Sequence, residues 1–106
     1  MRQKMLTKQI LFKIPPTGSN SNNKDPIIYL KLFCPWGSAT WYIAELDSDQ
    51  DYAFGYVTGL FEDEWGYVSL KELQAIQGPY GLYIERDKWF TPTRFSELKL
   101  KEKTNE

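Results

Sequence analysis

Apolar residues recur at every second position along much of the chain, a pattern typical of β-strands with one buried face. Ile28, Leu30 and Leu32 alternate in this way with larger or charged side chains. Short polar connections separate these runs, which predicts antiparallel pairing in a meander. The segments that predict strands are 27–33, 39–46, 52–59 and 82–85.

Two segments have helical spacing instead. The first, 7–14, begins with a capping residue and is followed by two prolines that prevent its continuation. The second begins at Ser69, and Glu72 three residues later completes the spacing of a capping box. Its apolar positions Leu70, Leu73 and Ile76 are expected to line one buried face, and the Gly-Pro pair at 78–79 ends it.

The remaining segments predict turns and loops. Residues 17–25 are rich in Gly, Ser and Asn, so a mobile loop is expected there. The stretch FEDEW at 61–65 is interpreted as a charged turn that leads into the second helix. Gly55, within a strand-like run, indicates a β-bulge or a close backbone approach. A last helical turn is expected within 91–98, and the tail from Lys99 is expected to fray.

These elements predict a small α+β domain: an antiparallel meander of three to five strands with two or three short helices packed on it. The 106 residues suffice for one modest core, so a single domain is expected, folded over about 6–98. Aromatic residues make up 16% of the chain and include four Trp and seven Tyr. Such large side chains allow a small core to suffice, or form a binding face.

Composition excludes several kinds of chemistry. The chain has no His, the commonest metal ligand and general base, so zinc sites and Ser-His or Cys-His pairs are excluded. The single Cys34 cannot form an internal disulfide, and no glycine spacing matches a phosphate-binding loop. We expect no cofactor and no bound metal. With neither a signal peptide nor an apolar stretch of about 20 residues, we also expect a cytoplasmic protein that does not cross a membrane.

Charge is unevenly distributed although the formal net charge is only -1. Residues 1–31 carry six bases and one acid, whereas 32–70 carry seven acids and no base. The rest is nearly balanced, with seven bases and six acids. Because the acidic zone is also the most aromatic, nucleic-acid binding through it is disfavoured. A partner with a basic surface fits better.

Several strings resemble, in order and spacing, a family of small bacterial domains known as domain-of-unknown-function family 2958. They are ATWYIAELD, FGYV, EWGYVSLKEL and GLYIERDKWFTP, preceded by the opening LTKQILFKIPP. The resemblance implies a protein carried by plasmids and conjugative elements, often near antirestriction genes. It also implies that the following positions recur in the family: Trp41, Glu45, Asp47, Gly55, Glu64, Gly66, Tyr67, Ser69, Leu70, Glu72, Leu73, Gly78, Glu85, Arg86, Asp87 and Pro92.

Clustered carboxylates raise an enzymatic alternative. Glu45, Asp47 and Glu64 would serve as acid and base, or hold a cation, if the fold brought them together. With Arg86 as the anion-binding group, they would make a small phosphate-handling or hydrolytic enzyme. Arg86 could instead form a structural ion pair with Asp47 or Glu64. The two-residue period of a strand places Arg86 on one side and its two acidic neighbours on the other.

The hypothesis we favour is a non-enzymatic interaction module of a mobile element. It would dock a basic nucleic-acid-handling or host-defence protein through an acidic, aromatic-rich face. A second alternative is a DNA-binding accessory protein, which would need the basic N-terminal segment to form one stripe. The candidate binding residues are Trp41, Glu45, Asp47, Glu62, Asp63, Glu64, Trp65, Tyr67, Glu85, Arg86 and Asp87.

Overall fold

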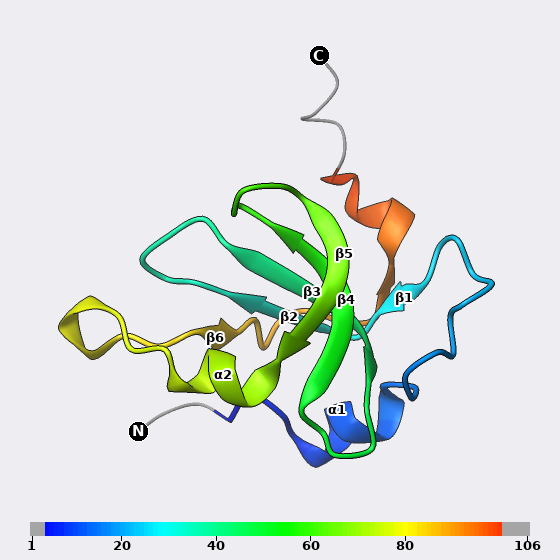
Figure 1. Cartoon of the computed structure of the whole chain (residues 1–106), viewed down its shortest axis with the longest axis horizontal. Helices are drawn as coiled ribbons and strands as arrows, with labels where there is room; N and C mark the ends of the chain where they lie inside the picture. The colour runs from blue at the N-terminus through cyan, green and yellow to red at the C-terminus, as the bar shows by residue number, and fades with distance from the viewer. Residues whose placement is uncertain (1–3, 101–106) are drawn as a thin grey trace.

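Five antiparallel strands form the main sheet of the protein, whose computed structural model describes residues 4–100. They are β2 (Leu30–Phe33), β3 (Thr40–Leu46), β4 (Tyr52–Thr58), β5 (Glu64–Ser69) and β6 (Glu85–Arg86). Their order is β5-β4-β3-β2-β6, which can be followed in Figure 1. The sheet is therefore a four-stranded meander with β6 added at its far edge, and the predicted α+β class is confirmed.

One face of this sheet carries the main core. The strand register places Leu30 beside Ile43 and Leu32 beside Trp41, so these four side chains share that face. Two short helices cover it, α1 (Lys8–Lys13) and α2 (Leu70–Ala75). The buried side chains of this cluster are Met5, Ile14, Leu30, Leu32, Ala39, Trp41, Ile43, Leu46, Ala53, Leu70, Leu73 and Ile84.

Both helices begin where the sequence predicts. The Thr7 hydroxyl accepts from the Ile10 amide at 3.2 Å, and the Ser69 hydroxyl accepts from the Glu72 amide at 3.2 Å. Each hydroxyl thereby satisfies a backbone donor that has no partner within its helix. The second helix ends earlier than expected, at its C-cap Ile76. The Ile76 side chain is therefore exposed, and its predicted place in the core is wrong.

A β-bulge in β3 decides which way Glu45 points. Trp41, Ile43 and Glu45 would all face the core if the strand alternated regularly. The register shifts between Ile43, which pairs with Gly55, and Glu45, which pairs with Phe54. This shift moves the carboxylate to the opposite face. A Cβ atom on Gly55 would lie 2.2 Å from the Tyr42 carbonyl oxygen, so the predicted close approach at Gly55 is confirmed.

Three expectations about secondary structure were wrong. FEDEW does not lead directly into the helix, because residues from Glu64 onwards form β5, and every residue of β5 pairs with β4 in regular register. The run 27–33 is divided near Tyr29: β1 (Ile27–Ile28) pairs with β7 (Thr93–Arg94) in a separate ribbon. The predicted strand at 82–85 is only two residues long, as β6, and follows a 3-10 turn, η1 (Pro79–Gly81).

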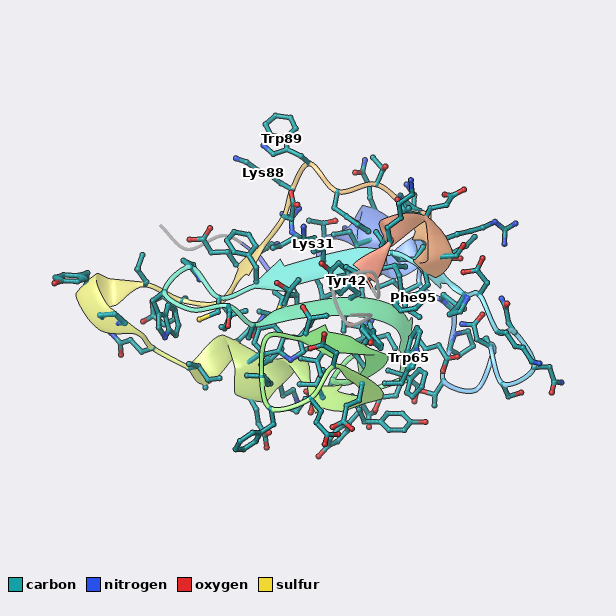
Figure 2. The ribbon with its side chains drawn as sticks, turned by 90° about the horizontal axis from the view of Figure 1, so that it is seen from above. Lys31, Tyr42, Trp65, Lys88, Trp89 and Phe95 are labelled. Carbon is teal, nitrogen blue, oxygen red and sulfur yellow. The ribbon has the colours of Figure 1, made fainter. Side chains whose placement is uncertain are left out.

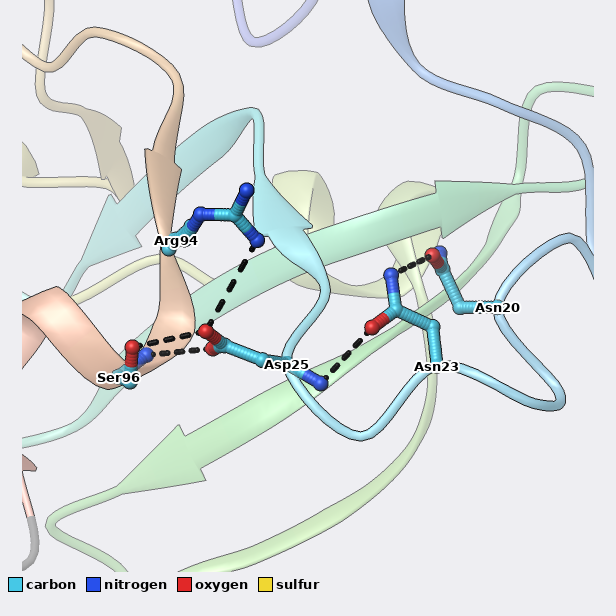
Figure 3. Close-up of polar contacts among 5 residues, drawn as sticks. All are labelled: Asn20, Asn23, Asp25, Arg94 and Ser96. Atoms are coloured by element: carbon cyan, nitrogen blue, oxygen red, sulfur yellow. Dashed lines mark hydrogen bonds and ion pairs between the residues drawn. The ribbon is translucent and has the colours of Figure 1, made fainter.

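The C-terminal segment packs against the other face of the sheet. A second buried cluster of Ile28, Tyr42 and Ala44 lies there, covered partly by Phe90 and by η2 (Phe95–Leu98). Figure 3 shows what holds this segment: Asp25 accepts from the Ser96 amide and hydroxyl, each at 2.8 Å. These hydrogen bonds, and then the Arg94 charge, lower the pKa of Asp25.

Residues 17–25 are better anchored than expected. The segment folds into successive turns, with the Asn20 side chain accepting from that of Asn23 at 3.2 Å and the Asn23 side chain accepting from the Asp25 amide at 2.9 Å (Figure 3). At the C-terminal end, Leu100 packs against the second cluster. The rest of the tail predicted to fray, 101–106, lies outside the described residues.

Candidate functional site

The acids of the 32–70 zone do not form one surface. Asp47, Asp49 and Asp51 lie at or beside the β3–β4 turn, whereas Glu62, Asp63 and Glu64 lie at or beside the β4–β5 turn. These turns are at opposite ends of β4, which has seven residues, so they are separated by roughly 20 Å. The acids therefore form two separate clusters and no continuous acidic patch.

Glu45 is a structural carboxylate. It is only 3% exposed, and its two oxygens accept from the Gly18 amide at 2.7 Å and the Asn20 amide at 2.9 Å. Hydrogen bonds to an ionised acceptor are among the stronger ones in proteins. Glu45 thus anchors the 17–25 segment against the sheet and is not available to a partner.

The acids of the β3–β4 turn also serve the fold. The Asp47 carboxylate accepts from the amides of Asp51 and Tyr52, which closes the hairpin. The Asp51 carboxylate accepts from the Lys71 amide at 2.9 Å and the Ser69 hydroxyl at 2.8 Å. These two hydrogen bonds lower the pKa of Asp51, in that order of importance. Asp51 therefore links the turn to the start of α2.

The β4–β5 turn is the most open of the acidic sites. Asp63 accepts from the Gly59 amide at 3.2 Å and shapes the turn, while Glu62 and Glu64 are exposed and make no ion pair within residues 4–100. Leu60 and Phe61 are exposed beside them. Of the residues predicted for binding, Glu62 and Glu64 thus remain accessible.

The predicted aromatic residues divide between core and surface. Trp41 is buried in the main core. Trp65 lies on the other face, where its ring contacts Phe54 at a centroid distance of 5.5 Å, Tyr56 at 5.3 Å and Phe95 at 4.8 Å. Burial, and then the Asp63 charge, raise the pKa of Tyr56.

Tyr67 extends this aromatic strip to the edge of the sheet. Its ring lies 5.0 Å from that of Phe54, yet the residue is 63% exposed. Strand β5 is the outer strand here, and within residues 4–100 no strand pairs with its free edge. An open backbone edge, exposed aromatic rings and two free carboxylates therefore occur together.

The predicted alternation around Arg86 is confirmed by its contacts. Asp87 lies 3.7 Å from Lys31 on one face of the sheet, whereas the Arg86 Nε donates to the Lys4 carbonyl at 3.0 Å. Glu85 pairs with Phe33 and so shares the face of Lys31. Asp87 also shapes a turn, because its side chain accepts from the Trp89 amide at 3.0 Å.

The residues of the enzymatic alternative do not converge. Glu64 and Arg86 lie on opposite edge strands with three strands between them, roughly 19 Å apart at the usual strand spacing. This separation also excludes the ion pair between them. Both carboxylate oxygens of Glu45 already accept hydrogen bonds from backbone amides, those of Gly18 and Asn20. Residues 4–100 contain no group of three acidic or cysteine side chains suited to hold a metal ion.

Two hollows flank the strand that contains Arg86. The larger, about 890 Å³, is lined by Phe33 and residues 81–89. The smaller, about 220 Å³, lies between α1 and residues 86–92. Lys88 and Trp89, which are not among the candidate binding residues chosen from the sequence, project from the turn beside them (Figure 2). The sequence signal for this turn was the Asp at the first position of DKWF, because Asp is favoured at the first position of a β-turn.

The family model described as "Protein of unknown function (DUF2958)" matches residues 4–100, nearly the whole chain. The chain belongs to this family. The resemblance seen in the sequence is therefore confirmed, and it covers every element from α1 to η2. Neither the curated proteins nor the solved structures include a match to this DUF2958 chain. No helix within the described part has the length and apolar character that a membrane crossing requires.

Proposed function

We propose that this DUF2958 chain is a non-enzymatic interaction module that binds an extended, basic segment of another protein along the free edge of β5. The observation that carries the proposal is the combination at this edge: a six-residue strand whose outer edge has no partner strand within residues 4–100, an exposed Tyr67, and the accessible carboxylates of Glu62 and Glu64. The docking surface is thus the β4–β5 turn and its edge strand.

The backbone of β5 supplies the affinity in this proposal. In an antiparallel sheet, every second residue of an edge strand directs its N–H and C=O away from the sheet. A partner segment that adds as a further strand satisfies these groups, a common form of peptide recognition. Gly66 lies in the middle of β5, and no atom is within 4 Å of a Cβ placed there, so the edge is open on that face as well.

The aromatic strip supplies apolar contact. Trp65 and Tyr67 are both held against Phe54, so their rings are already ordered before a partner arrives. Ordered aromatic side chains lose little conformational entropy on binding, and they dominate the energetics of many interfaces. A partner side chain on the same face would lie along this strip.

Charge selects the partner. Glu62 and Glu64 lie at one end of β5 and make no ion pair within the described residues. Lysine or arginine side chains of an added strand would pair with them. The negative electrostatic field of these two carboxylates would also speed the encounter with a basic protein. The resemblance to proteins of plasmids and conjugative elements supports a nucleic-acid-handling or host-defence protein, met in the cytoplasm, as that partner.

The test is an NMR titration of the isotope-labelled protein with a short peptide of alternating lysine and valine. We expect saturable shifts concentrated in β5 and in the β4–β5 turn, with slower amide exchange at alternate residues of β5. Glu62→Lys/Glu64→Lys should weaken binding, whereas the matched control Asp49→Lys/Glu97→Lys, which changes the net charge equally at other exposed acids, should not. Shifts elsewhere, or equal losses in both variants, would refute the proposal.

A further inference from the structure

The smaller hollow, between α1 and residues 86–92, is strongly basic. Four of the side chains that line it are cations, Lys13, Lys31, Arg86 and Lys88, against the single carboxylate of Asp87. The Asp87 charge is already balanced by Lys31 at 3.7 Å. Lys13 and Lys88 remain as cations of the hollow beyond this pair, and among residues 4–100 no further carboxylate lines it, which favours an anionic group.

An exposed tryptophan, Trp89, follows Lys88 of this hollow directly in the chain and itself lines the larger hollow next to it. Trp89 is 85% exposed, and Figure 2 shows it projecting with Lys88 from the turn, away from the body of the protein. The turn is well defined, because the Asp87 side chain accepts from the Trp89 amide and the Asp87 carbonyl accepts from the Phe90 amide at 3.1 Å. The ring is thus presented on an ordered backbone next to a lysine.

Together these features match the way proteins hold single-stranded nucleic acid. Such sites combine cations along the backbone with aromatic rings on which unpaired bases stack. A volume of about 220 Å³ can take a phosphate group and part of its sugar, but no regular helix. In a duplex the bases are already stacked on one another, so Trp89 would have no face of a base to contact.

We propose that this hollow binds a phosphate group of a single-stranded nucleic acid, with a neighbouring base stacked on Trp89. The site lies at the β6 edge of the sheet, opposite the β5 edge, so it is independent of the interaction surface proposed above. It differs from a stripe of N-terminal bases, because Arg86 and Lys88 come from the other end of the chain.

Fluorescence anisotropy of a labelled oligothymidine, measured over a range of salt concentrations, tests the proposal. If about three phosphates are neutralised, the logarithm of the binding constant should fall with the logarithm of salt with a slope of about -2. Trp89→Ala should weaken binding roughly 5- to 150-fold, the range measured when a stacking ring is removed. A duplex of the same sequence should bind more weakly than the single strand.

Charge variants locate the site. Lys13→Glu/Lys88→Glu should abolish most of the binding and reduce the salt slope, whereas Lys24→Glu/Lys71→Glu, with the same change of net charge at exposed lysines outside the hollow, should retain it. The proposal is overturned if wild type shows no saturable binding at low salt. Equal losses in the two double variants would also overturn it, because they would indicate attraction to the overall charge only.

Discussion

Replacing Glu45 with Gln tests whether one buried carboxylate holds the 17–25 segment to the sheet. The carboxylate offers an oxygen to each of two amides, those of Gly18 and Asn20. A glutamine keeps one acceptor and turns an NH₂ group, itself a donor, towards the other amide. The variant therefore loses one hydrogen bond, weakens the second by removing the charge, and leaves a donor without an acceptor.

The expected loss follows from these changes. A hydrogen bond to a charged group contributes about 1.5–3 kcal/mol, and a buried unsatisfied group costs about 1–3 kcal/mol, part of which local relaxation recovers. We expect Glu45→Gln to lower the free energy of unfolding by about 2–4 kcal/mol. For a domain of this size, that corresponds to a fall in Tm of about 10–20 °C.

Thermal unfolding followed by circular dichroism measures the fall in Tm, and limited trypsin digestion reports on the segment itself through the bond after Lys24. Glu62→Gln is the matched control, because Glu62 is exposed and such surface changes stay within about 0.5 kcal/mol. If Glu45→Gln unfolds at the same temperature as Glu62→Gln and is cleaved no faster, the anchoring role is wrong.

Two further predictions concern stability. The Lys71 amide lowers the pKa of Asp51 below its ordinary value of 3.8, so the ionised carboxylate stabilises the fold above that pH and this stabilisation is lost as the pH falls through the lowered pKa. The Tm of Asp51→Asn should therefore fall less than that of wild type between about pH 7 and pH 3. An equal fall in Tm would contradict this. A Cβ on Gly78 would lie 2.5 Å from the Trp36 ring, so Gly78→Ala should lower the free energy of unfolding, measured with denaturant, by about 1–3 kcal/mol. Gly66→Ala should not, because the space around Gly66 is open. Equal losses in the two variants would refute the steric argument.

The sequence predicted the elements that depend on local chemistry. The hydroxyl of Ser69 caps α2, and Gly55 lies where two backbones approach closely, both as expected. These signals work because a cap or a close approach restricts the residue type at one position. The same holds for the alternation around Arg86, which follows from strand geometry alone.

Strand β5 was missed because its evidence is not local. Gly66 interrupts the apolar pattern, and Glu64 and Tyr67 are exposed, so the segment has no continuous buried face. Its pairing with β4 along its whole length makes it a strand. The division of 27–33 has the same cause, since β1 pairs with a segment near the other end of the chain.

The candidate site was harder to predict than the fold. Seven acids in one zone of sequence suggested one surface, but antiparallel strands carry successive turns to opposite ends of a sheet. The bulge in β3 also reversed the direction of Glu45, and no property of the residue itself indicates this. Surface sites depend on topology, which residue types specify only indirectly.

The link between Asp25 and Ser96 joins residues that are 71 positions apart in the sequence. Contacts between residues so far apart in sequence form late in folding, because a long loop must close before they can be made. The meander from β2 to β5 needs only neighbouring strands, whereas Tyr42 and Ala44 on the second face stay uncovered until the segment with Phe95 packs on them. Folding should therefore pass through a state in which this second, aromatic face of the sheet is still open.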